Sequence, residues 1–124
     1  RYDVTVIRDE LQRGDLWWDV LLLNGKMTGY TSYVLADVPG TMKLDKLYLH
    51  PHAQRQGYGG KLIDHGVSVM EGCGCKRLWL AVYWHSKSAI AAYHKHGFRI
   101  AETSLREIGG GFLMDDYIMV KEAV

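Results

Sequence analysis

The stretch that decides the fold reads Leu47-Tyr-Leu-His-Pro-His-Ala-Gln54-Arg-Gln-Gly57-Tyr-Gly-Gly60-Lys-Leu62. It begins as an apolar strand, continues through a polar loop, and opens a helix with three closely spaced glycines. Glycines allow a ligand to approach the backbone closely, and a helix N-terminus directs unpaired amides at the same point. Arg55 and Lys61 add positive charge. This stretch therefore predicts a backbone cradle for an anion.

Two familiar phosphate-binding motifs do not fit this stretch. A P-loop requires Ser or Thr after Gly-Lys, but Leu62 follows Gly60-Lys61, and no glycine stands at the earlier position. A dinucleotide-binding fingerprint requires a third glycine at position 62, which is again leucine. On these residues alone, a glycine-rich helix start without a ligand remains the alternative.

The elements on either side of this stretch follow from periodicity and turn signals. A short helix is predicted over 3–13, because Val4, Ile7 and Leu11 have helical spacing and Gly14 follows. Asn24-Gly25 is a strong hairpin signal. Strands are predicted over Trp17–Leu23, Lys26–Ala36, Met42–His50, Lys76–Trp84, Phe98–Glu107 and Phe112–Val120, with turns over Asp37–Gly40 and Gly109–Gly111. Helices are predicted over Gly57–Cys73 and from a cap at Ser86 to Gly97.

The strand over Lys76–Trp84 carries apolar residues on both faces, which predicts a strand covered on both sides and paired in parallel with its predecessor. The fold class is therefore α+β, or mixed α/β: a mostly antiparallel sheet with one parallel β-α-β step, flanked by helices. No linker or repeat divides the chain, so residues 1–124 are expected to form a single domain.

Composition excludes several classes of function. Lys plus Arg total 15 and Asp plus Glu total 14, a net charge of +1, so nucleic acid is not the expected partner. No apolar run approaches the roughly 20 residues that span a bilayer. Cys73 and Cys75 form one Cys-x-Cys pair, half a zinc site at most, so no metal is expected. Two reduced cysteines fit a cytoplasmic protein.

Two motifs resemble the GNAT superfamily of N-acetyltransferases. The first is Gln54-x-x-Gly57-x-Gly59, and the second is Ala89-Ile-Ala-Ala-Tyr93-His-Lys95-His-Gly97-Phe98. Together the resemblance covers residues 24–120. Leu78-Trp-Leu-Ala-Val82-Tyr-Trp, the Cys-x-Cys pair before it and Asp116-Tyr-Ile-Met119 are most similar to the spermidine/spermine branch.

The resemblance implies acetyl-CoA as co-substrate and direct transfer of the acetyl group to a primary amine, a polyamine or another small amine. The strand backbone would pair with the pantetheine arm, the amides of the glycine loop would hold the pyrophosphate, and a backbone amide near Leu49 would stabilise the oxyanion. Implied donor-binding residues are Leu47, Tyr48, Leu49, Gln54, Arg55, Gln56, Gly57, Tyr58, Gly59, Gly60, Lys61, Ser86 and Lys95. Ser86 stands where the family often has asparagine.

Tyr93 matches the tyrosine that protonates the departing thiolate in the family, although a core aromatic is the alternative. Asp45 is the candidate base; alternation places it on the same face as Leu47 and Leu49, and a surface charge is the alternative. Aromatic residues on the early strands are candidates for the wall of an acceptor pocket, although ordinary sheet packing is the alternative for each. These are Trp17, Trp18, Tyr30 and Tyr33.

Three further expectations rest on the resemblance. The chain is expected to lack an N-terminal strand and a first helix, which shape the acceptor side in the family. A homodimer is expected to form through an edge at Phe112–Val120. The alternatives to small-amine acetylation are acetylation of a peptide or protein amine, and a module that binds acyl-CoA without chemistry.

Overall fold

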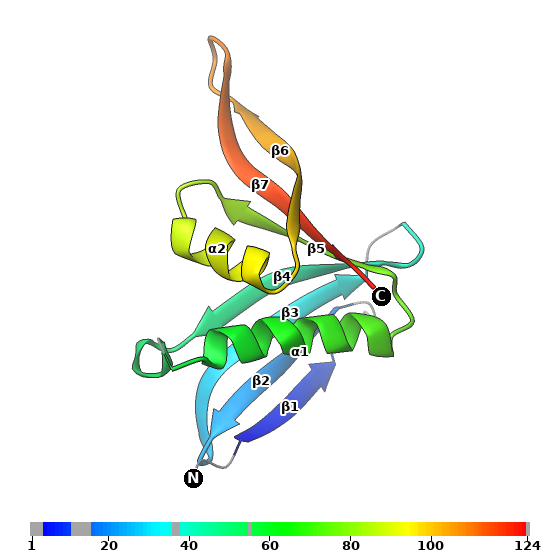
Figure 1. Ribbon diagram of the computed structural model, residues 1–124, viewed down its shortest axis with the longest axis vertical. Helices are drawn as coiled ribbons and strands as arrows, with labels where there is room; N and C mark the ends of the chain where they lie inside the picture. The colour runs from blue at the N-terminus through cyan, green and yellow to red at the C-terminus, as the bar shows by residue number, and fades with distance from the viewer. Residues whose placement is uncertain (1–3, 11–15, 36–37, 55, 124) are drawn as a thin grey trace.

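In the part of the chain that the structure describes, seven strands form one sheet in the order β1-β2-β3-β4-β5-β7-β6 (Figure 1). The computed structural model describes residues 4–10, 16–35, 38–54 and 56–123. The strands are β1 Val4–Glu10, β2 Leu16–Leu23, β3 Lys26–Leu35, β4 Thr41–Leu49, β5 Arg77–Tyr83, β6 Arg99–Glu107 and β7 Phe112–Glu122. The helices are α1 Tyr58–Gly72, α2 Lys87–Lys95 and the short 3-10 helix η1 Pro51–Ala53. This is the mixed α+β class that the sequence predicts.

The hairpin between β2 and β3 turns at the predicted Asn24-Gly25 pair. Both residues have positive φ, 53° and 80°, which a two-residue hairpin turn of the primed type requires. Trp17 then lies opposite Tyr33 in an antiparallel pair. The sequence prediction of this hairpin is confirmed.

The parallel step joins β4 to β5 through α1. Only three residue pairs connect the two strands, and they end at Lys43 and Trp79. All other neighbouring strands in the sheet are antiparallel. Beyond Lys43 no residue of β4 pairs with β5, so β4 has an open edge over residues 44–49, which we call the wedge. This wedge positions the candidate site.

The hydrophobic core lies between the sheet and the two α-helices, which cover the same face (Figure 1). Met70 on α1, Leu78 on β5 and Met119 on β7 are fully buried there, and Ile90 on α2 packs against the same cluster. Within the described ranges no helix covers the opposite face, and none is long and apolar enough to cross a membrane.

The predicted helix over residues 3–13 is wrong. Val4–Glu10 form strand β1, which pairs antiparallel with all but the first residue of β2. A run of β-branched residues favours a strand, and pairing with β2 overrides the helical spacing of three apolar positions. The expectation that an N-terminal strand is missing depended on this predicted helix. It is not supported, because β1 forms an edge strand of the sheet.

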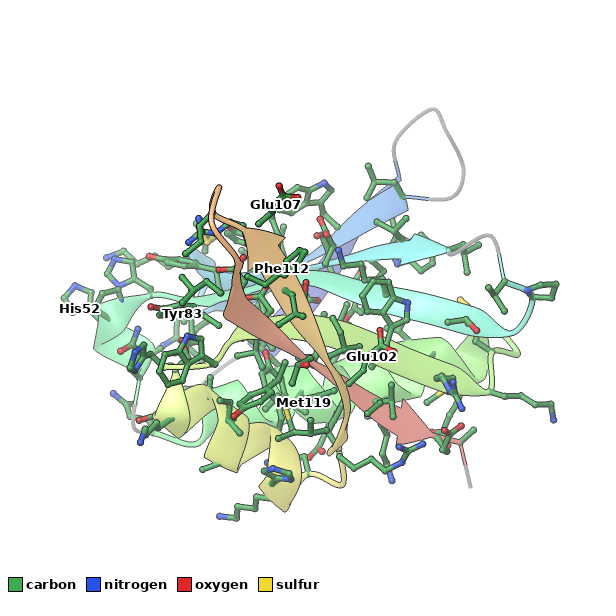
Figure 2. All side chains as sticks on the ribbon, turned by 90° about the horizontal axis from the view of Figure 1, so that it is seen from above. His52, Tyr83, Glu102, Glu107, Phe112 and Met119 are labelled. Atoms are coloured by element: carbon green, nitrogen blue, oxygen red, sulfur yellow. The ribbon has the colours of Figure 1, made fainter. Side chains whose placement is uncertain are left out.

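Two further expectations are corrected by the sheet. β5 is buried on one face only, because Leu78, Leu80 and Val82 are buried whereas Ala81 and Tyr83 are exposed. β7 is not an edge strand, since it lies between β5 and β6. The edge strand on this side of the sheet is β6, which carries Glu102 and Glu107 (Figure 2) and whose residues are exposed apart from a half-buried Ser104. The predicted edge at Phe112–Val120 is therefore wrong.

Candidate active site

The open edge of β4 is the first part of the site. The His50 N–H donates to the Thr28 carbonyl on β3 at 2.7 Å. Because successive strand residues direct their amides to opposite edges, Leu49 and Leu47 direct theirs toward the wedge. There Gln54 Nε2 donates to the Leu49 carbonyl at 3.0 Å. The sequence predicts that Gln54 lies in the loop, but it does not predict that the side-chain amide of Gln54 binds the open edge of β4.

The glycine loop follows directly. Gly57 is the N-cap of α1 with φ of 85°, a conformation that favours glycine, and no side chain caps the helix. The first amides of α1 are therefore not satisfied by a capping side chain and lie beside the end of β4. Arg55 lies outside the described residues, whereas Gln56, Tyr58 and Lys61 flank this N-terminus. Tyr58 is buried, and Lys61 Nζ lies 5.4 Å from the centroid of its ring.

A contact between the two helices sets the position of this loop. His96, the C-cap of α2, approaches Gly60 so closely that a Cβ on that glycine would lie 2.8 Å from His96 Nε2. His96 Nδ1 lies 2.7 Å from Asp64 Oδ1 on α1. Through these contacts of His96, the C-terminal end of α2 packs against the first turns of α1. The sequence shows these residues but gives no signal of their contact.

A β-bulge at Asp45 changes which face of β4 each residue occupies. Ser32 pairs with Lys46 and Tyr33 with Leu44, so Asp45 is an extra residue in β4. Leu47 and Leu49 consequently pack toward α1, while Asp45 pairs with Lys46 at 2.8 Å and Lys43 at 3.3 Å. The expectation that Asp45 shares a face with Leu47 and Leu49 is wrong. These lysines, Lys46 above all, hold the pKa of the Asp45 carboxyl below its ordinary value.

Tyr93 lies on the face of α2 that packs against the core. Its ring is half-buried and meets Phe98 edge-on, with centroids 5.5 Å apart. Leu47 on β4 and Tyr93 on α2 both pack against the same core cluster. Burial raises the pKa of the Tyr93 hydroxyl, so the hydroxyl is protonated at neutral pH. Both the core reading and a proton-donor reading fit this position.

The other two implied donor contacts are on α2. Ser86 is the N-cap residue, as predicted, but its side chain makes no capping hydrogen bond and is half-buried. Lys95 is exposed in the last turn. Among the described residues, no group of three or more His, Cys, Asp or Glu side chains is arranged to hold a metal ion. Cys73 and Cys75 are free thiols.

The four aromatic candidates divide between the two faces of the sheet. Trp17 and Tyr33 are buried in the core, their rings 5.7 Å apart. On the face that the described helices leave uncovered, Trp18, Tyr30 and Tyr48 form a row with centroids 5.1 and 5.3 Å apart. Sequence reasoning assigned Tyr48 only a backbone role and missed its place in this row.

The comparisons with known proteins identify the family. Residues 2–98 match the acetyltransferase (GNAT) family. The chain therefore belongs to this family of acyltransferases, as the two sequence motifs indicate.

Matched relatives and structures agree with this assignment. The ribosomal protein bS18-alanine N-acetyltransferase of Escherichia coli (strain K12) is 36% identical over 83 residues, 65% of this chain and 53% of that protein. The chain thus spans about half the length of this curated relative. A crystal structure of the Escherichia coli ribosomal-protein-S18-alanine N-acetyltransferase has a TM-score of 0.74 and 29% identity, covering 87% of this chain and 69% of that one.

A GNAT acetyltransferase from Elizabethkingia anophelis with acetyl-CoA bound has a TM-score of 0.81 at 15% identity, covering 97% of this chain and 98% of that one. This likeness concerns the fold. The resemblance to the spermidine/spermine branch is not supported, because the matched curated relative is a ribosomal-protein acetyltransferase.

Proposed function

We propose that the protein transfers the acetyl group of acetyl-CoA directly to a primary amine of a peptide. The observation that carries this proposal is the wedge beside the α1 N-terminus, where β4 has an open edge next to uncapped helix amides. The pantetheine arm would pair with the backbone of Leu47 and Leu49 as an added strand, and the pyrophosphate would lie on the amides of residues 56–60. Tyr48 would not take part in this pairing, because its backbone is directed toward Tyr30 on β3. Ser86 and Lys95 would contact the donor from α2.

The proposed chemistry needs a nucleophilic nitrogen and a proton for the leaving thiolate. The neutral amine attacks the thioester carbonyl, and the amide of Leu49 stabilises the resulting oxyanion. The tetrahedral intermediate then breaks its carbon–sulfur bond, and Tyr93 donates its proton to the thiolate of CoA. The extra proton on the nitrogen leaves to water, which later reprotonates Tyr93. No covalent enzyme intermediate or metal takes part.

The weakness of Asp45 as a base favours a peptide α-amine as acceptor. At pH 7 about one in seven molecules of a peptide α-amine with a pKa near 7.8 is neutral, against about one in 2,500 for an alkyl amine with a pKa near 10.4. A carboxylate that accepts from two lysines deprotonates an alkyl ammonium poorly. We propose that Asp45 orders water and lysines beside the site rather than removing the amine proton itself.

Two lysines on the uncovered face of the sheet also favour a peptide over a polyamine as acceptor. Lys46 Nζ lies 5.6 Å from the Trp18 ring centroid, and Lys43 Nζ lies 4.9 Å from that of Trp79. These lysines already occupy the positions where aromatic rings attract cations, so a polycation would meet repulsion there. The name of the Escherichia coli relative also specifies an alanine of a ribosomal protein as its acceptor. We place this reaction in the cytoplasm, where two free thiols remain reduced.

The test is a comparison of acceptors under one assay for CoA thiol release. The panel contains a peptide that begins with alanine, the same peptide with its N-terminus blocked and a lysine added, and spermidine. We expect the highest kcat/KM for the free α-amine. Higher kcat/KM with spermidine contradicts the peptide assignment, whereas CoA binding without turnover of any amine indicates a binding module.

A further inference from the structure

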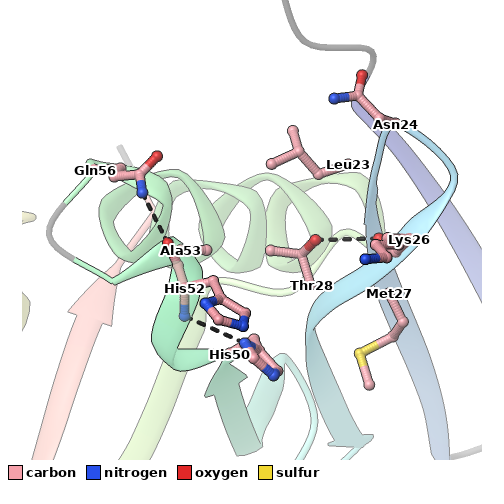
Figure 3. A pocket seen from close by; sticks show the side chains of 9 residues that line it. All are labelled: Leu23, Asn24, Lys26, Met27, Thr28, His50, His52, Ala53 and Gln56. Carbon is pink, nitrogen blue, oxygen red and sulfur yellow. Dashed lines mark hydrogen bonds between the residues drawn. The ribbon is translucent and has the colours of Figure 1, made fainter.

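A pocket of about 550 Å³ lies outside the wedge, between the β2–β3 hairpin and the loop that follows β4 (Figure 3). Its walls come from the hairpin turn, the start of β3 and the segment around η1. The lining residues are Leu23, Asn24, Lys26, Met27, Thr28, His50, His52, Ala53 and Gln56. Apart from Gln56, which belongs to the proposed pyrophosphate loop, no residue of this lining has a role in the proposed function.

Among the described residues, the polar lining of the pocket includes one ammonium group and two imidazoles and no carboxylate. Lys26 lies on the hairpin wall of the pocket, and His50 and His52 lie on the opposite wall (Figure 3). His50 Nδ1 accepts from the His52 backbone N–H at 3.2 Å, so a neutral His50 carries its proton on Nε2 and can donate from there. The two imidazole rings stack with centroids 4.5 Å apart. An ammonium and two imidazoles around one space are suited to an anion with several acceptor oxygens.

The walls of the pocket are held in place by the same segment that forms the glycine loop. Gln56 Nε2 donates to the His52 carbonyl at 2.7 Å, and the His50 N–H donates to the Thr28 carbonyl at 2.7 Å. Gln56 lines the pocket and directly precedes Gly57, the N-cap of α1. The pocket therefore adjoins the proposed pyrophosphate site while lying on its β3 side.

We propose that this pocket binds a phosphate group, held by Lys26, His50 and His52. The phosphate has two chemical sources: the 3′-phosphate of the acyl-CoA donor, or a separate phosphate ion. The first source rests on the proposed function, because it requires CoA in the wedge. The second does not.

Calorimetric titration of the whole chain distinguishes these sources. The probes are CoA, 3′-dephospho-CoA and inorganic phosphate, each titrated into the wild type, Lys26→Gln and His52→Gln. The matched control is Lys76→Gln, an exposed lysine before β5 and outside the pocket lining. Circular dichroism verifies that each variant is folded.

If the donor supplies the phosphate, Lys26→Gln weakens CoA about tenfold and leaves 3′-dephospho-CoA unchanged. If the pocket binds a separate phosphate ion, Lys26→Gln and His52→Gln both lose affinity for inorganic phosphate, and their affinities for CoA and 3′-dephospho-CoA are unchanged. Either result supports the pocket. Unchanged affinity of Lys26→Gln and His52→Gln for all three probes overturns it. The wild type could bind inorganic phosphate, with loss of binding in Lys26→Gln, and yet bind neither form of CoA. That result contradicts the proposed function but supports phosphate binding in the pocket.

Discussion

The ring of Tyr93 is half-buried against Phe98 at the face of α2 that meets the core. Replacing Tyr93 with phenylalanine keeps this packing and removes only the proposed acid. We expect kcat to fall about a hundredfold, with the KM for acetyl-CoA nearly unchanged. Thiol release measures both constants. An unchanged kcat means that the tyrosine is only a core aromatic.

The same hydroxyl has a predictable pH dependence. Burial raises the pKa of Tyr93 above its ordinary value of 10.0, so the proton is retained at neutral pH and is lost only above pH 10. Loss of the acid therefore does not reduce kcat between pH 7 and pH 9. A fall in kcat over that range, absent in Tyr93→Phe, contradicts the raised pKa.

Gly60 has no room for a side chain because His96 lies against it. We expect Gly60→Ala to displace His96 from Asp64, shift the first turn of α1 and raise the KM for acetyl-CoA several-fold. The double variant Gly60→Ala/His96→Ala removes the clash and is expected to recover part of the loss. Gly72→Ala is the control, since nothing lies within 4 Å of a Cβ there. If Gly60→Ala and the control Gly72→Ala have equal KM values for acetyl-CoA, the steric argument is contradicted.

Helix α1 is fixed to the sheet by a polar contact as well as by its apolar face. His65 Nε2 lies 2.7 Å from Oδ2 of Asp19 on β2, a residue only 2% exposed. His65→Ala removes one partner of this buried carboxylate, and we expect it to lower the free energy of unfolding by about 2–4 kcal/mol. Ser68→Ala, at an exposed position of α1, is the control. Urea denaturation compares the two; equal midpoints show that the contact is unimportant.

Local sequence signals predicted those elements whose structure is decided locally. Asn24-Gly25 predicts the hairpin because both residues adopt positive φ, and the glycines of residues 57–60 predict the start of α1. The predicted helix over residues 3–13 failed because partner strand β2 decides the conformation of Val4–Glu10. A pattern of three apolar positions cannot reveal such a partner.

The candidate site was predicted to a similar extent. The motifs locate Gln54, Gly57 and Tyr93 in the chain. The bulge at Asp45 arises from the register between β3 and β4, but the sequence does signal it: two polar residues, Asp45 and Lys46, separate Leu44 from Leu47 and interrupt the alternation of β4. The prediction extended the alternation from Leu49 back to Asp45 and ignored this interruption. The pocket beside Lys26, by contrast, depends on how two distant loops meet.

At the scale of the whole molecule, Glu122 joins three strands near the C-terminal end of β7. Its carboxylate pairs with Arg77 at 2.8 Å and Arg99 at 3.2 Å, which lie at the starts of β5 and β6. Arg77 above all holds the pKa of Glu122 below its ordinary value of 4.5. The unfolded chain then binds more protons, so this contribution to stability is lost as the pH falls below 4.5.

The matching experiment follows the urea midpoint between pH 7 and pH 3. We expect a modest fall in the wild type that is smaller in Glu122→Gln, since exposed ion pairs contribute little. Glu102→Gln, on exposed β6, is the control. Identical pH profiles for the wild type and Glu122→Gln contradict this role.

The sheet consists of a block of four strands, β1 to β4, and a block of three, β5 to β7, and only three residue pairs between β4 and β5 join the two blocks. A donor lying in the wedge would bond to one block and contact α2 on the other. Deuterium exchange is therefore expected to slow at the amides of Leu47 and Leu49 when CoA is added, with no change across β2 and β3. In the proposed reaction, a bound donor adds a further strand partner to the open edge of β4, and each release of CoA would expose that edge again.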